Sequence, residues 1–63
     1  MIIREWVIDY KDAVGNVTKS YTFEHEDDAH VCMVFDGFEC EKYENGVYYH
    51  RKGEQTADLY GRG

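Results

Sequence analysis

The sequence predicts an α+β domain with the order ββαββ, a four-stranded antiparallel sheet with one helix packed on one face. Three observations predict this fold. Two early segments alternate apolar and polar residues, an acid-led segment with helical spacing follows, and Asn45-Gly46 separates two further alternating segments. Because a chain of 63 residues suits one hydrophobic core, residues 1–63 are expected to form a single small domain.

The first hairpin is expected within residues 2–24. Residues 2–10 alternate, with Trp6, Ile8 and Tyr10 on one face, as in a half-buried strand. Residues 17–24 alternate in the same way and place Tyr21 and Phe23 together. Residues 11–16 between them contain a glycine and several polar residues, which is typical of a turn. The two segments therefore predict an antiparallel pair with an aromatic inner face.

Residues 25–36 are expected to form the helix. Acids crowd the start of this segment, where they favour the positive end of the helix dipole, and Gly37 suits the position just past a helix end. The alternative is a strand through residues 31–35, which are apolar and contain two valines. A helix is favoured because both end signals agree. Its apolar stripe is Ala29, Cys32 and Met33, flanked by Val34 or Phe35.

The second hairpin is predicted by Asn45-Gly46, which suits a two-residue type I′ turn. Such a turn sets the register of the strands. The predicted pairs are Glu44 with Val47, Tyr43 with Tyr48, Lys42 with Tyr49, Glu41 with His50, Cys40 with Arg51 and Glu39 with Lys52. The face toward the core is expected to carry Phe38, Cys40, Val47 and Tyr49. The polar segment that follows, residues 53–63, is expected to dock through Ala57, Leu59 and Tyr60, with its last few residues frayed.

The distribution of charge is the main indication of function. The chain has 13 acidic and seven basic residues, and its excess of acids lies between residues 24 and 44, where Lys42 is the only base. A negative surface repels nucleic acid and attracts basic protein surfaces. An alternative is that the acids only cap the helix and keep the chain in solution. The candidate partner-binding acids are Glu24, Glu26, Asp27, Asp28, Asp36, Glu39, Glu41 and Glu44.

Tyr43 and Tyr48 are candidate anchors within the same binding surface. The predicted register places them opposite each other on the exposed face, beside Glu41 and near Glu39. Tyrosine combines a large contact area with few rotatable bonds, and its ring can receive an arginine by cation–π contact. The alternative is structural, since an aromatic cross-strand pair also stabilises a sheet.

Catalysis, metal binding and cofactor binding are not expected. His25 and His30 are five residues apart and Cys32 and Cys40 eight apart, which does not match the close ligand pairs of zinc modules. A small enzyme or metal protein that uses Cys40 and His50 is the third hypothesis. The start of the chain does not read as a signal peptide and no apolar stretch spans a membrane. A cytoplasmic location is therefore expected, with Cys32 and Cys40 as free thiols and one disulfide as the alternative.

In size and charge the chain resembles the small acidic inhibitors that phages direct against bacterial defence, of the anti-CRISPR and DNA-mimic type. The resemblance implies a non-enzymatic inhibitor that docks carboxylates on a basic, nucleic-acid-binding surface, such as that of a nuclease or CRISPR effector. The alternative is a generic interaction module or small homo-oligomer, such as a homodimer, whose charge serves solubility.

Overall fold

Strands β1 (Glu5–Lys11) and β2 (Val17–Phe23) form an antiparallel hairpin in the computed structural model, which describes residues 2–63. The connecting turn is closed by Asp12, whose Oδ1 accepts hydrogen bonds from the backbone N–H groups of Val14 and Asn16, both at 3.0 Å. A short polar side chain that binds nearby backbone in this way is typical of turns. The first predicted hairpin is confirmed.

Helix α1 (Glu26–Phe35) follows β2, so the prediction of a helix rather than a strand is also confirmed. Its end is a Schellman motif, with Gly37 at a φ of 79°. The N–H of Gly37 donates to the carbonyl of Val34, and the N–H of Phe38 donates to the carbonyl of Met33, both at 3.0 Å. Because Phe38 and Met33 both lie in the core, the motif also places the start of the next strand against the helix.

Strands β3 (Glu39–Glu44) and β4 (Val47–Lys52) meet at the predicted two-residue turn. Asn45 and Gly46 have φ values of 53° and 80°, as a type I′ turn requires. The predicted pairs are correct from the turn as far as Lys42 and Tyr49. Beyond that point the predicted register is wrong.

An irregularity between Cys40 and Lys42 shifts the pairing, so Cys40 lies opposite His50 and Glu39 opposite Arg51. One extra residue in a strand has this effect, because two residues then face one across the ladder. Nothing in the turn sequence specifies such a bulge several residues away. The predicted pair of Glu41 with His50 is therefore not formed.

The prediction of a four-stranded sheet is wrong, because β5 (Gln55–Arg62) forms a fifth antiparallel strand. The strand order is β2-β1-β5-β4-β3, which places β5 at the centre between β1 and β4. A two-residue turn with Gly53 at a φ of 63° leads into it. The polar residues between Lys52 and Thr56 and the late Gly61 hid a short alternation centred on Ala57 and Leu59.

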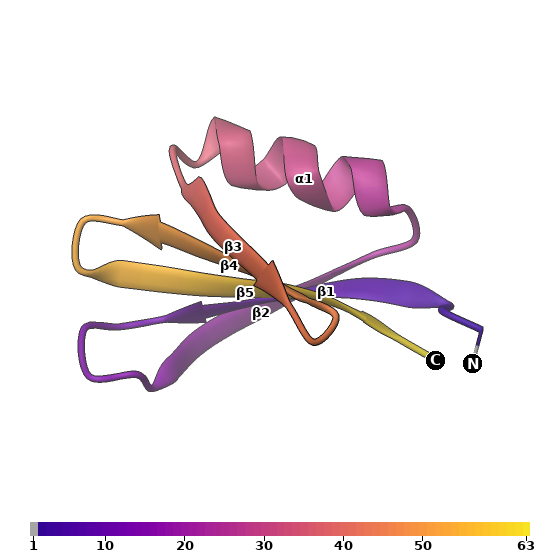
Figure 1. Ribbon diagram of the computed structural model, residues 1–63, viewed down its shortest axis with the longest axis horizontal. Helices are drawn as coiled ribbons and strands as arrows, with labels where there is room; N and C mark the ends of the chain where they lie inside the picture. Colours follow the sequence, from indigo (N-terminus) through magenta and orange to yellow (C-terminus); the bar gives the residue numbers. More distant parts are fainter. Residues whose placement is uncertain (1) are drawn as a thin grey trace.

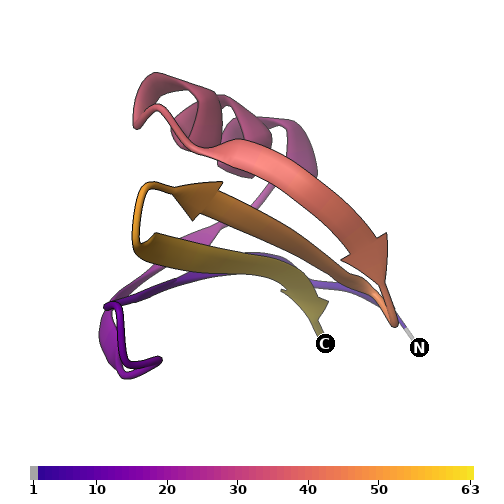
Figure 2. The same cartoon turned by 60° about the vertical axis from the view of Figure 1, so that its left-hand side comes forward.

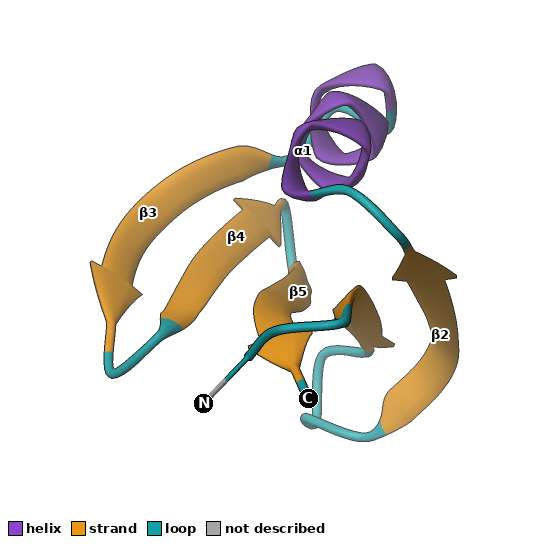
Figure 3. Ribbon diagram, turned by 90° about the vertical axis from the view of Figure 1, so that its right-hand side faces the viewer, coloured by secondary structure: helices purple, strands orange, loops and turns teal. Residues whose placement is uncertain are grey.

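Helix α1 packs on one face of the sheet, which we call the inner face (Figure 1). The turned view shows α1 above the sheet with β3 running from the end of the helix down one edge (Figure 2). Seen from the end, the strands curve around the side on which α1 lies (Figure 3). The core between them consists of Ile8, Tyr10, Ala29, Met33, Phe38, Ala57 and Leu59.

The predicted inner face of β4 is also wrong. His50 is buried and Tyr48 packs against the core, so Val47 and Tyr49 point to the opposite, outer face. The alternation along β4 places Tyr48 and His50 on one face and Val47 and Tyr49 on the other, but it does not indicate which face is toward the helix. Strand β5 decides it, because the smaller Ala57 and Leu59 lie opposite His50 and Tyr48 and leave room for both rings.

Candidate acidic interface

Four carboxylates surround the start of α1 and form what we call the acidic turn, namely Glu24, Glu26, Asp27 and Asp28. Glu26 is half-buried and the other three are exposed. Their charge complements the helix dipole, which accounts for part of their presence. Among residues 2–63, Glu24, Asp27 and Asp28 take part in no ion pair. The acidic turn therefore presents uncompensated negative charge to the solvent.

Beside the acidic turn, Glu26 joins His30, Tyr43 and Tyr48 in a group that we call the tyrosine cluster. The Tyr48 hydroxyl donates to Glu26 Oε2 at 3.0 Å, and His30 Nε2 contacts the same oxygen at 3.0 Å. The rings of Tyr43 and Tyr48 have centroids 4.4 Å apart, and that of His30 meets Tyr48 edge-on at 4.7 Å. Two predicted anchors and one predicted acid are thus brought together.

These contacts shift the pKa values of two members of the cluster, Glu26 and Tyr48. The hydrogen bond with His30, aided by the one from Tyr48, lowers the pKa of the Glu26 carboxyl. The contact with that carboxylate raises the pKa of the Tyr48 hydroxyl. Glu26 is therefore ionised and oriented at neutral pH. Tyr43 is the exposed member of the cluster, so its ring is accessible to the solvent.

His50 lies beneath the tyrosine cluster as the one buried polar side chain of the described chain. Its Nδ1 lies 3.1 Å from the backbone carbonyl of Tyr48. Burial lowers the pKa of its imidazole, although the backbone contact opposes that shift. His50 is thus neutral near pH 7 and acts as a core residue. The sequence analysis placed it on the exposed face instead.

The acids of β3 lie apart from the acidic turn. Because Glu39 pairs with Arg51 and Glu44 with Val47, their side chains belong to the outer face. Glu41 receives Arg51 Nε at 3.2 Å and Glu44 receives Lys42 Nζ at 3.4 Å. The helix acids and the strand acids therefore do not share one face, although the sequence predicted them as parts of one binding surface.

The outer face of the sheet neutralises most of its charge internally. The four ion pairs between Lys or Arg and a carboxylate in the described chain all lie there. They are Lys11–Asp58 and Arg62–Glu5, both at 2.6 Å, Arg51–Glu41 and Lys42–Glu44. Asp9, in the same layer, accepts hydrogen bonds from Ser20 at 2.6 Å and Tyr60 at 3.0 Å. This face has little free charge with which to attract a partner.

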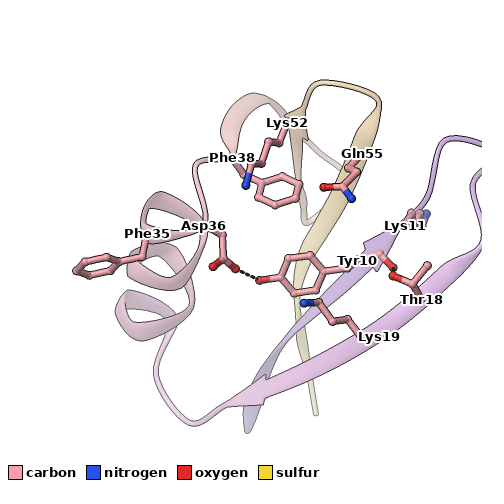
Figure 4. A pocket seen from close by; sticks show the side chains of 9 residues that line it. All are labelled: Tyr10, Lys11, Thr18, Lys19, Phe35, Asp36, Phe38, Lys52 and Gln55. Carbon is pink, nitrogen blue, oxygen red and sulfur yellow. Dashed lines mark hydrogen bonds between the residues drawn. The ribbon is translucent and has the colours of Figure 1, made fainter.

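Asp36, a further predicted site residue, lies at the opposite end of α1 and is half-buried. Its carboxylate accepts a hydrogen bond of 2.5 Å from the hydroxyl of Tyr10, as Figure 4 shows. Burial and this hydrogen bond raise the pKa of Tyr10 well above its ordinary value. Asp36 is therefore used inside the fold and is not one of the free carboxylates.

A cleft of about 320 Å³ opens beside Asp36, and its flanks are basic. Lys19 Nζ lies 4.8 Å from the ring centroid of Tyr10, and Lys52 Nζ lies 5.8 Å from that of Phe38. Figure 4 shows both lysines beside the aromatic rings. The helix side of the molecule thus changes from acidic at the start of α1 to mixed charge at its end.

Helix α1 also exposes a row of apolar residues that was not predicted from the sequence, Val31, Val34 and Phe35. Val34 or Phe35 was expected beside the buried stripe, whereas both point away from the sheet. Ala29 and Met33 are buried and Cys32 is half-buried, so the predicted stripe itself is confirmed. A second set at spacing i, i+3 and i+4 was visible in the sequence and indicates an apolar outer face.

The third hypothesis, chemistry at Cys40 and His50, gains little from the geometry. The two residues lie opposite each other, but Cys40 Sγ contacts the carbonyl of Lys42 and His50 contacts that of Tyr48. Cys32 and Cys40 are both free. Within residues 2–63, no three side chains of His, Cys, Asp or Glu gather as they would around a metal ion.

No helix in the described part of the chain has the length and apolar character needed to cross a bilayer.

Comparison with known proteins adds no relative. The chain matches no protein-family model, no curated protein and no solved structure.

Proposed function

We propose that this chain is a non-enzymatic inhibitor that docks its acidic turn and tyrosine cluster on the basic, nucleic-acid-binding surface of a bacterial defence protein. The target class is a nuclease or CRISPR effector, as for the small acidic phage inhibitors that the chain resembles. The protein acts in the bacterial cytosol. It uses no cofactor and does not itself contact nucleic acid.

The observation that carries this proposal is the division of charge between the two sides of the molecule. The outer face of the sheet pairs four of its carboxylates with lysine or arginine, and a fifth, Asp9, accepts hydrogen bonds from Ser20 and Tyr60. The acidic turn leaves Glu24, Asp27 and Asp28 free, within the described chain, and α1 contains no lysine or arginine. Free carboxylates at one place attract a surface that normally binds phosphates.

The tyrosine cluster supplies the orientation that free charge lacks. Glu26 is held by His30 and Tyr48, so its carboxylate is ordered before a partner arrives. Tyr43 is exposed beside it and can stack on an arginine side chain. Glu39, Glu41 and Glu44 lie on the outer face of the edge strand β3, so they make no direct contact with the partner.

The test begins with capture from a bacterial lysate at low salt on immobilised protein, followed by elution with rising salt. We expect the captured protein to bind nucleic acid, and the free chain to compete with that nucleic acid. Affinity falls as salt rises because exposed charges are screened beyond about 10 Å at 0.1 M. Neutralising the three free acids, in E24Q/D27N/D28N, weakens binding roughly tenfold.

Two controls make this result specific. E54Q removes an exposed carboxylate in the turn before β5 and should leave affinity unchanged. Reversal of Glu39, Glu41 and Glu44 to lysine tests the strand acids and should weaken binding less than the same reversal in the acidic turn. An affinity that stays constant from low to high salt, or a captured protein that does not bind nucleic acid, would refute the proposal.

A further inference from the structure

Helix α1 carries an exposed apolar row, Val31, Val34 and Phe35, which we call the helix stripe. These side chains are 51%, 75% and 85% exposed, respectively. No other element of the described chain exposes three large apolar side chains. The spacing i, i+3 and i+4 puts them on one side of α1, opposite the buried Ala29 and Met33. Together with His30 they line a shallow hollow of about 390 Å³.

The acidic turn continues the same side of the helix. Asp27 and Asp28 precede Val31 by four and three residues, so they lie one turn nearer the start of α1. The ten-residue helix is roughly 15 Å long. Its outer side thus has an acidic half followed by an apolar half. A partner that covers both halves needs apolar side chains one to two helical turns away from its basic ones.

Charge decides between the occupants of such a surface. A second copy would bring together two chains of net charge −6 whose stripes both border acids, which disfavours the pair. A membrane surface with anionic lipids is repelled by the same carboxylates. A basic amphipathic segment satisfies both halves of the surface, since its apolar side chains meet valine and phenylalanine and its basic ones meet aspartate.

We propose that the outer side of α1 binds a basic amphipathic segment of the partner protein, with apolar anchors on the helix stripe and lysine or arginine on Asp27 and Asp28. This inference rests on the proposed function, because it names the part of the partner that the acidic turn meets. It adds an apolar contribution that salt does not screen. Binding therefore weakens with salt but does not vanish.

Two fluorescent synthetic probes test the inference at low salt by anisotropy, an amphipathic leucine–lysine helical peptide and an oligolysine of equal charge. The intact protein should bind the amphipathic peptide roughly tenfold more tightly than oligolysine. The V34A/F35A variant should lose this difference and still bind oligolysine normally. V14A is the matched control, because Val14 is 79% exposed but lies in the turn between β1 and β2. D27N/D28N should weaken both probes.

The outcomes separate this inference from the proposed function. If V34A/F35A binds the amphipathic peptide as tightly as the intact protein, the inference is wrong. The proposed function is still supported in that case if D27N/D28N weakens the binding of oligolysine. If neither probe binds at low salt, both fail. A dimer in sedimentation, or binding to phosphatidylcholine vesicles, that V34A/F35A abolishes would also overturn it. Unfolding followed by circular dichroism checks that each variant folds. Alanine at exposed helix positions should not prevent folding, because it has a high helix propensity.

Discussion

Truncation of Leu59 to alanine tests the central position of β5. Leu59 is fully buried and lies between Ile8 of β1 and Tyr48 of β4. Replacement of a buried leucine by alanine costs about 2–5 kcal/mol, and the cost is largest where the site cannot collapse. Paired strands on both sides hold this site open, so we expect a loss of about 3–4 kcal/mol.

That loss is a large part of the total stability. A domain of this size has a free energy of unfolding of about 3–9 kcal/mol. For a 60–100-residue domain, 1 kcal/mol changes Tm by about 4–8 °C, so L59A should lower Tm by roughly 12–32 °C. Thermal and urea unfolding followed by circular dichroism measure both quantities.

Two variants make the result interpretable. V14A removes an exposed side chain and should change the free energy of unfolding by less than about 0.5 kcal/mol. L59M keeps most of the volume and should cost less than about 1.5 kcal/mol, which provides a folded comparison if L59A is unfolded at room temperature. If L59A were as stable as V14A, β5 would not be a central strand and the core described above would be incorrect.

Three further predictions concern stability. Burial lowers the pKa of His50 below its ordinary value of 6.5, so the folded state favours the neutral ring. The stability that this group contributes is complete above pH 6.5 and falls as the pH drops below it. H50Q should therefore reduce the change in Tm between pH 7.5 and 5.5. Y10F removes the hydroxyl that binds Asp36 and should lower the free energy of unfolding in urea by about 1–2 kcal/mol. Because the folded state raises the pKa of Tyr10, the stability from its neutral hydroxyl is lost as the pH rises above about 10. Y10F should therefore lose less stability than the intact protein at alkaline pH. G46A places a side chain at a φ of 80° and should lower the free energy of unfolding by about 1–2 kcal/mol, measured as a lower Tm than that of V14A. An unchanged Tm would contradict the type I′ turn.

Local signals predicted the elements they directly specify. Gly37 and the leading acids specified the ends of α1, and Asn45-Gly46 specified the second hairpin and its first three pairs. The bulge at Glu41 had no local signal, and the alternation around Ala57 and Leu59 was too short to predict the fifth strand, because both features depend on contacts distant in the sequence. Ala57 and Leu59 form a recognisable strand only because β1 and β4 lie on either side of them.

The candidate site was predictable in part for the same reason. The acids before and within the first turn of α1 and the Tyr43–Tyr48 pair could be identified from the chain alone. The sides on which Glu39 and Glu44 lie could not, because the sheet had to be complete before its inner face was defined. The link from Tyr48 to Glu26 joins residues 22 positions apart and appears only in the folded chain.

The strand order also governs when the protein can fold during its synthesis. Among the described elements, β1 leaves the ribosome before the others and β5 leaves after them, yet the two are neighbours at the centre of the sheet. Until β5 arrives, the two hairpins have no strand between them and α1 has no complete sheet to cover. Long-range pairing of this kind slows folding and leaves strand edges exposed meanwhile. The sheet can therefore be completed only after β5 has been synthesised, and the net negative charge of the chain reduces association between partly folded copies until then.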